Sequence, residues 1–310
     1  MDFERSAEQQ AIVEAVEALL ARRAGPARAI ELDAKGGYDD ALDAALAEAG
    51  FSGAELARDV GPLEAALVVE AVARAGGAVA AGANLLVAPC AAERALPTPI
   101  AIARAGDDAP VRFAAHACTL LLDAGDEARV IALAAGDATP VRSNFMVPLG
   151  RVRADLPGGE SLGAGSGARL RRWWRVALAA ECLGTMEAAL AVTVDYVKRR
   201  REFGRAIGSF QALQHRLAEC AVRVEATRWL TCEAAARGAD EQAAATAAAY
   251  AADAAHRVFR ETHQMTGAMG FTREHDLHVW SMRLEALRVE LGGVSAHRRA
   301  IARARWMRSS

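Results

Sequence analysis

The chain has 310 residues, of which 53% are hydrophobic but only 5% aromatic, and its formal net charge is −2. This length allows one large folding unit or two to three small ones. The near balance of 37 basic and 39 acidic residues gives no electrostatic reason to expect a nucleic acid or an anionic membrane as a partner. Alanine, which has the highest helix propensity, dominates the hydrophobic residues, so the composition favours a helical protein.

The cysteines and the N-terminal sequence indicate the cellular compartment. An odd, dispersed set without CxxC spacing predicts buried thiols in a reducing cytoplasm, not a disulfide framework or a zinc site. The set consists of Cys90, Cys118, Cys182, Cys220 and Cys232. We find no run of about 18 apolar residues that avoids charge, and the acidic, polar start MDFERSAEQQ is unlike a signal peptide. We therefore expect a cytoplasmic protein with no membrane span and no bound metal.

The first third of the chain has helical periodicity. Apolar residues at helical spacing predict a helix over residues 5–23, which Gly25-Pro26 ends. The same pattern predicts helices over 39–49 and 62–75, and a further apolar stretch runs to about Leu96.

The character changes between Pro99 and about Gly163. Short apolar runs alternate with Asp-Asp, Gly-Asp and Gly-Gly, a pattern typical of a small β unit. Strands are predicted at 100–102, 111–113, 120–122 and 130–133. The glycine-rich residues 158–167 are predicted to be a linker back into helix.

From Arg169 the pattern is helical to the end. Helices are predicted over residues 169–201, 211–237, 239–265 and 273–290, with a tail helix after Ser295. Helices of this length pack as an antiparallel bundle. The predicted fold is therefore mostly α: a helical domain over 1–97, a short β domain over 98–164 and a helical bundle over 165–310.

Two segments carry a functional signal. In the first, RREFGRAIGSFQ, the turn after a long helix presents Arg200, Phe203 and Gln211; these groups suit a dinucleotide, because a guanidinium binds a pyrophosphate as a bidentate donor. In the second, HQMTGAMGF, Gln264 lies one turn before Gly267, in a small-residue turn that lets backbone approach a ligand. Taken separately, each segment is better explained as an ordinary helix end that caps and packs locally.

Together, in this order and at this separation, the two segments resemble the acyl-CoA dehydrogenase family, whose pattern is R-x-x-F-G followed by Gln and later Q-x-x-G-G-x-G-F. The N-terminal MDFERSAEQQAIVEAV and GPLEAALVVEAVARAGG are also similar to helices of that family. The resemblance implies a helical N-terminal domain, a β middle domain and a C-terminal four-helix bundle, with FAD as cofactor at a subunit interface.

The resemblance also implies roles for individual residues. Arg200, Phe203 and Gln211 match positions that reach the FAD of a neighbouring subunit, and Gln264 and Gly267 match positions at its pyrophosphate and adenosine. Ala268 replaces the second glycine of the family pattern, and its methyl group would crowd that approach. Arg175 matches a family arginine near the acyl-CoA substrate.

The family's catalytic base is missing from its usual place. The chemistry removes an α proton from an acyl thioester with a carboxylate, while hydride passes from the β carbon to the flavin. The commonest base position, in a Y-E-G-T turn, aligns with Leu291, and Glu290 is one place off, which on a continuous helix is a rotation of about 100°. We expect Glu290 to point elsewhere as a solvated helix-end residue, unless the helix ends early.

The alternative base position is also unsuited to proton abstraction. It aligns with Trp174, whose indole cannot usefully accept a proton, and Glu181, two turns later, is expected to be a packed or interface residue. The threonine that follows the family base and supports FAD is Gly293 here.

The middle domain lacks the family's flavin-ring segment, T-E-P-x-x-G-S-D, and its following tryptophan strand. The resemblance is therefore to the short subunit of hetero-oligomeric (α2β2) acyl-CoA dehydrogenases that degrade steroids. It implies a longer acyl-CoA dehydrogenase partner that carries the base and the flavin-ring site. Two alternatives stay open: an independent homo-oligomeric dehydrogenase that uses Glu290, and a non-catalytic interaction protein on a decayed dehydrogenase fold.

Overall fold

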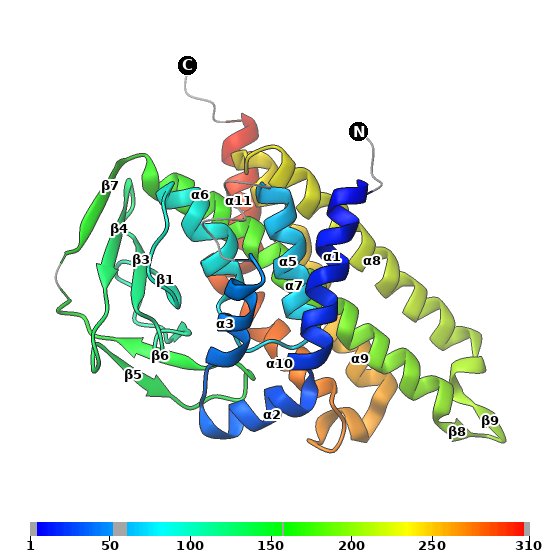
Figure 1. Ribbon diagram of the computed structural model, residues 1–310. Helices are drawn as coiled ribbons and strands as arrows, with labels where there is room; N and C mark the ends of the chain where they lie inside the picture. Colours follow the sequence, from blue (N-terminus) through cyan, green and yellow to red (C-terminus); the bar gives the residue numbers. More distant parts are fainter. Residues whose placement is uncertain (1–4, 52–60, 157, 307–310) are drawn as a thin grey trace.

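The computed structural model describes residues 5–51, 61–156 and 158–306. Helices from both ends of the chain pack together into one body, and two small sheets lie at one side of it (Figure 1). The mostly α fold predicted from the sequence is confirmed.

The N-terminal helices form where the apolar periodicity predicts them. They are α1 (Ala7–Arg23), α3 (Asp40–Glu48) and α5 (Pro62–Arg74), followed by the π-helix η1 (Gly82–Val87) and the short α6 (Ala88–Ala92). Helix α2 (Pro26–Lys35) was not predicted. Gly25-Pro26 does end α1, but Pro26 also begins α2, because proline is well suited to the first turn of a helix, where its missing N–H has no partner to lose.

The middle of the chain forms two sheets. The first has the strand order β1-β3-β4-β7, with β1 parallel to β3 and the other pairs antiparallel; the second is antiparallel with the order β2-β6-β5. The strands are β1 (Ile100–Arg104), β2 (Val111–Arg112), β3 (Thr119–Asp123), β4 (Glu127–Ala132), β5 (Ala138–Val141), β6 (Leu149–Val152) and β7 (Glu160–Ala164). The predicted linker over 158–167 was wrong in part, because β7 lies within it and pairs with β4.

The C-terminal bundle follows the predicted helices closely. It consists of α7 (Ser166–Arg199), α8 (Gln211–Ala236), α9 (Glu241–Thr266), α10 (Leu277–Leu287) and α11 (Gly293–Trp306). The hairpin of β8 (Arg201–Glu202) and β9 (Arg205–Ala206) and the 3-10 turn η2 (Ile207–Ser209) connect α7 to α8. The 3-10 turns η3 (Gly267–Phe271) and η4 (Glu290–Gly292) flank α10.

Helix α7 is the core of the molecule and contacts α5, α8, α9 and α10. By length and composition alone it could cross a membrane, but its apolar part contains Glu181 and Glu187, and 83% of its apolar window is buried inside the fold. Gly184 makes the contact with α5 possible, because a Cβ there would lie 2.1 Å from the carbonyl oxygen of Glu70.

A buried arginine fixes α10 to the rest of the fold. Arg283 donates hydrogen bonds to the carbonyl oxygens of Gly77 (2.8 Å), Met146 (3.0 Å) and Gly76 (3.1 Å). Burial without a paired carboxylate lowers the pKa of Arg283 to about 10. Helix α10, and the turn that follows it, are thus tied to both the helical and the sheet regions.

The prediction that all five cysteines are buried was wrong in part. Cys182 and Cys220 are buried and all five are free thiols, but Cys118 is exposed and the remaining two are half-buried.

Candidate functional site

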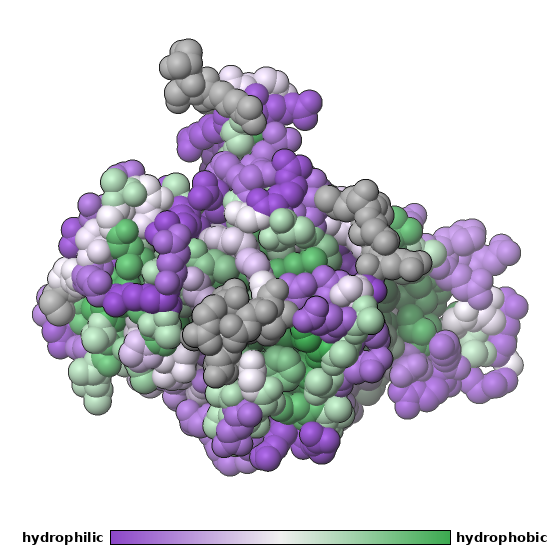
Figure 2. Space-filling model, turned by 45° about the horizontal axis from the view of Figure 1, so that its top comes forward, coloured by the Kyte–Doolittle hydropathy of each residue, from purple (hydrophilic) through white to green (hydrophobic). Residues whose placement is uncertain are grey.

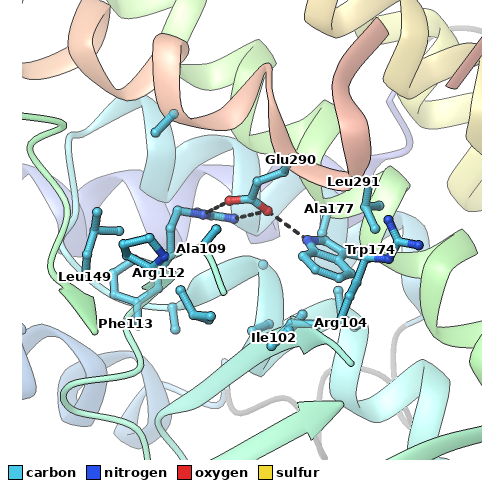
Figure 3. A pocket seen from close by; sticks show the side chains of 18 of the residues that line it. Ile102, Arg104, Ala109, Arg112, Phe113, Leu149, Trp174, Ala177, Glu290 and Leu291 are labelled. Carbon is cyan, nitrogen blue, oxygen red and sulfur yellow. Dashed lines mark hydrogen bonds and ion pairs between the residues drawn. The ribbon is translucent and has the colours of Figure 1, made fainter. Parts of the chain in front are cut away.

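A cavity of about 460 Å³ lies between the sheets and the helices. It is enclosed by η1, the ends of β1 and β2, helix α7 and the turn η4 (Figure 3). Most of the wall is apolar, with Ile100, Ile102, Phe113, Leu149 and Ala177 among its residues. Its polar groups are few: Arg104, Asp107, Arg112, Trp174, Glu181 and Glu290. A mostly apolar pocket with a few convergent polar groups is the usual form of a small-molecule site.

Glu290 points into this cavity, so the expectation that it is a solvated helix-end residue was wrong. The predicted rotation assumed a helix continuous to residue 290, but α10 ends at Leu287, and Leu291 adopts a left-handed φ of 52°. The turn η4 therefore directs Glu290 to the same interior as Trp174 and Arg112 (Figure 3).

The Glu290 carboxylate is held from two sides. The Arg112 guanidinium forms an ion pair with it, through Nε to Oε1 and through Nη2 to Oε2 at 3.4 Å. The Trp174 indole Nε1 donates a hydrogen bond to Oε2 at 2.9 Å. Trp174, which aligns with the family's alternative base position, thus contacts Glu290, the carboxylate next to Leu291 at the usual base position.

Arg112 also contacts a second carboxylate. Its Nη2 donates to Glu181 Oε2 at 2.9 Å, so the guanidinium lies between Glu181 and Glu290. Glu181 is therefore more than the packed residue that the sequence predicted, because it lines the cavity and is ion-paired there.

One guanidinium, that of Arg112, serves two carboxylates in this group. Burial works against the charged guanidinium, but Glu181 and Glu290 outweigh it and raise the pKa of Arg112 above its ordinary value. Burial raises the pKa of Glu181, and the Arg112 guanidinium opposes that rise. Charge-assisted hydrogen bonds of this kind are strong and hold a carboxylate in its ionised, oriented form.

This arrangement is poorly suited to proton abstraction by Glu290. Both carboxylate oxygens already accept hydrogen bonds, and a general base needs an oxygen within reach of the substrate proton. Sequence reasoning did not find Arg112, although a charged residue within the apolar run Val111-Arg112-Phe113 was the available signal.

The predicted cofactor residues do not line this cavity and are exposed on the surface. Arg200 is exposed and its Nη2 donates to Glu202 at 2.5 Å; Phe203 is 90% exposed at the turn of the β8–β9 hairpin, with a left-handed φ of 53°. Gln211 is exposed at the first residue of α8.

The second predicted segment lies at the same end of the bundle. Gln264 and Gly267 are exposed where α9 ends, and Gly267 has a φ of 58°. Helices α8 and α9 are antiparallel neighbours, and Arg216, near the start of α8, pairs with Glu261, near the end of α9, at 2.5 Å. The structure therefore brings the two segments to one end of one helix pair.

Arg175, the predicted substrate-binding residue, is buried on α7 and pairs with Glu241 at 2.6 Å. It does not line the large cavity but a second hollow beside it. Leu291, at the usual base position, and Arg104 line both spaces.

Two family models match the chain and together cover most of it. The acyl-CoA dehydrogenase N-terminal domain matches residues 6–94, and the acyl-CoA dehydrogenase C-terminal domain matches residues 171–305. The chain belongs to the acyl-CoA dehydrogenase family. Enzymes of this family are flavin-dependent oxidoreductases that bind FAD.

Curated relatives match over parts of their sequences. The chain is 41% identical over 108 residues to the acyl-CoA dehydrogenase IpdE2 of Mycobacterium tuberculosis, covering 35% of this chain and 34% of the relative. It is 37% identical over 134 residues to the acyl-CoA dehydrogenase FadE34 of the same organism, covering 41% and 19%. The matches thus span about a third or less of these relatives.

Solved structures share the fold over nearly the whole chain. A chain of the ChsE4-ChsE5 complex from Mycobacterium tuberculosis superimposes with a TM-score of 0.83 at 24% identity, covering 100% of both chains. Butyryl-CoA dehydrogenase from Megasphaera elsdenii superimposes with a TM-score of 0.79 at 21% identity, covering 98% of this chain and 99% of the other. At these identities the likeness establishes the acyl-CoA dehydrogenase fold.

Proposed function

We propose that this chain is the shorter, non-catalytic subunit of a hetero-oligomeric acyl-CoA dehydrogenase, and that it completes the FAD site of a longer partner. The observation that carries the proposal is the state of Glu290. The one carboxylate beside the usual base position is held by Arg112 and Trp174, and Leu291 takes the base position itself. The reaction of this family, dehydrogenation between the α and β carbons of an acyl-CoA, then needs a base from another chain.

The groups offered to a neighbour have the right chemistry for FAD. An exposed guanidinium (Arg200), an exposed ring (Phe203) and two exposed amides (Gln211 and Gln264) gather at one end of the α8–α9 pair. An arginine guanidinium binds a pyrophosphate through two hydrogen bonds, and side-chain amides can hydrogen-bond to polar edges of the dinucleotide. Gly267, which has no side chain, lets the backbone come close to the ligand. FAD, when bound there, would supply the hydride acceptor, and this chain would orient its nucleotide half.

A two-chain assembly also agrees with the fold comparison, because one of the structures with this fold is a complex of two different chains, ChsE4 and ChsE5. Another is described as a steroid acyl-CoA dehydrogenase composed of Tcur3481 and Tcur3483. By analogy, we propose lipid or steroid degradation as the metabolic setting and a bulky acyl-CoA as the partner's substrate.

A specific observation favours one alternative. Glu290 does face the cavity, so an independent homo-oligomeric enzyme could use it if Arg112 moved away. That enzyme would have to break an ion pair and a hydrogen bond before it could abstract a proton.

Purification alone and in complex decides between these functions. The full chain, a longer family member and the two co-expressed would each be tested for bound flavin by absorbance and for acyl-CoA dehydrogenation with an artificial electron acceptor. We expect flavin and activity only in the co-expressed complex. Flavin-loaded, active protein from this chain alone would overturn the proposal in favour of the Glu290 enzyme. If a longer family member forms a complex with this chain but gains neither flavin nor activity from it, the chain is a non-catalytic interaction protein.

A further inference from the structure

A second group of charged side chains lies away from the cavity, where the N-terminal helices pack on the bundle. At its centre is Arg228 on α8. Its guanidinium contacts Glu70 on α5 through Nη1 and Glu187 on α7 through Nη2, the latter at 2.5 Å. Helices α5, α7 and α8 pack against one another at this point (Figure 1). We call Arg228, Glu70 and Glu187 the Arg228 cluster.

The Arg228 cluster is unlike the charged surface of the protein. In Figure 2, hydrophilic residues gather on the projecting ends of α8 and α11, where water surrounds them. By contrast, the side chains of Glu70, Arg228 and Glu187 are 4%, 12% and 24% exposed. Electrostatic interactions are stronger in such surroundings than in water. This strengthens the attraction between Arg228 and each glutamate, and also the repulsion between the two glutamates.

The cluster has more carboxylates than its cations can neutralise. Arg74 Nη1 lies 3.5 Å from Glu187 Oε2, and Arg5 Nη2 lies 3.9 Å from Glu70 Oε1. Two more carboxylates pair with Arg74 and Arg228 from outside the cluster, namely those of Glu17 and Glu225. Three guanidinium groups therefore face four carboxylates, which leaves one negative charge in excess when all of these groups are ionised.

One oxygen of the cluster also lacks a hydrogen bond. Glu187 Oε2 is buried, and apart from its ion pair with Arg74 it accepts no hydrogen bond from the residues that the structure describes. A buried carboxylate oxygen without a donor is costly. The Glu70 carboxylate is within hydrogen-bonding reach of Glu187, and two carboxyl groups that share a site favour one proton between them.

The direction of titration agrees with this geometry. Burial, and then the Glu70 carboxylate, raise the pKa of Glu187 above its ordinary value, while Arg228 and Arg74 oppose the rise. The thiol of Cys232, which also lies near Glu70, stays neutral because burial raises its pKa to about 11.

We propose that the Arg228 cluster is a proton-sensitive latch between the N-terminal helices and the bundle. Glu187 takes up a proton from solvent and donates it to Glu70 in a hydrogen bond. Return of this proton to solvent at higher pH leaves two carboxylates on one guanidinium, and the contact of α5 with α7 and α8 loosens. The inference goes beyond the proposed function, because it concerns neither the cavity nor the FAD-directed residues.

The latch has a definite pH dependence. Because the pKa of Glu187 is raised in the folded chain, the folded state binds the proton more tightly than the unfolded state does. This contribution to stability is complete below the ordinary pKa of 4.5, and it is lost as the pH rises through the folded pKa. It therefore acts in the opposite sense to acid denaturation.

The test compares the purified full chain with its E187Q variant. Glutamine has the shape of glutamate, is neutral at every pH and can still donate to Glu70, so circular dichroism should show a normal fold. Urea unfolding is measured between about pH 5 and pH 8. Over this interval we expect the unfolding constant of the wild type to rise at least about threefold relative to that of E187Q. Hydrogen exchange in α5 and α8, corrected for the chemical rate, should rise with pH in the wild type alone.

The matched control is E225Q, which makes the same charge change beside the same Arg228, but at a side chain that is 51% exposed. It should keep the wild-type pH dependence. E70Q removes the acceptor and the like charge, so it should abolish the dependence as E187Q does, and it carries the same test if E187Q does not fold.

Three results would overturn the proposal. Parallel curves for the wild type and E187Q would mean that Glu187 takes up no proton. An equal loss of pH dependence in E225Q and E187Q would assign the effect to overall charge. Stability that depends on pH without a matching change of exchange in α5 and α8 would mean that the proton does not control the contact between these helices. None of these measurements involves flavin or a partner, so failure here is distinguishable from failure of the proposed function.

Discussion

Trp174 and Glu290 lie 116 positions apart in the sequence, yet the Trp174 indole N–H donates to the Glu290 carboxylate at 2.9 Å. The two residues stand at the alternative base position and beside the usual one. Neither is a free base: one cannot accept a proton, and the other already accepts hydrogen bonds from Trp174 and Arg112. Their contact joins them to Arg112 and Glu181 in one hydrogen-bonded cluster.

Replacing Trp174 by phenylalanine tests the contribution of this hydrogen bond. The variant keeps an aromatic ring but removes the donor to an ionised oxygen, so we expect the free energy of unfolding to fall by about 1.5–3 kcal/mol. Urea unfolding measures it. Trp173→Phe is the control, because Trp173 is equally buried (6% against 7% exposed). If both variants lose the same stability, ring volume rather than the hydrogen bond explains the effect.

Removing Arg112 should be more costly. Arg112→Gln leaves Glu181 and Glu290 facing each other in a partly buried cluster without the cation between them. Breaking such a pair by deleting one partner costs about 3–5 kcal/mol. Arg94→Gln is the comparison, since its pair with Glu160 is exposed and should contribute about 0–1 kcal/mol. A loss as small as that of Arg94→Gln would show that Arg112 does not hold the cluster together.

Arg200→Ala tests the FAD-directed role. Arg200 is exposed, so its loss should leave the thermal unfolding of this chain unchanged while FAD binding by the hetero-oligomer weakens about tenfold. Flavin content per complex and FAD titration measure this. Lys198→Ala removes the same charge from an exposed site two residues earlier. Unchanged flavin content in Arg200→Ala, or an equal decrease in both variants, would remove the role assigned to Arg200.

His297 should make stability fall in acid. Burial, and to a smaller extent Arg175, lower the pKa of His297 from 6.5 to about 4. Because the folded pKa lies below the unfolded value, the neutral ring contributes stability that is complete above pH 6.5 and is lost as the pH falls towards 4. This contribution is about 3 kcal/mol.

The matching measurement is urea unfolding between pH 7 and pH 4. His297→Leu, which cannot gain a charge, should lose less stability over this interval than the wild type. His256→Gln, at an exposed position, should follow the wild-type curve. Parallel curves for wild type and His297→Leu would mean that other groups account for the acid sensitivity.

Local patterns determined the helices of this protein, because helical periodicity and the helix-ending glycines and prolines act within a few residues. They placed α1, α3, α5 and all the bundle helices, and the two family segments at the ends of α7 and α9. They missed α2, where the same proline follows one helix and starts the next, and β7, whose glycines concealed a strand that forms only by pairing with β4.

The site itself was decided by the tertiary structure. Residue counting along an assumed continuous helix predicted that Glu290 points away from the interior. In the structure α10 ends at Leu287 and Leu291 is left-handed, so Glu290 points inward. Its partner Arg112 lies 178 positions earlier, on a strand with no sequence motif of its own. The sequence could show that the usual base is a leucine. Only the folded chain, by bringing β2, α7 and η4 together, decided that the neighbouring carboxylate is paired with an arginine rather than free, because such pairing depends on contacts that no local pattern encodes.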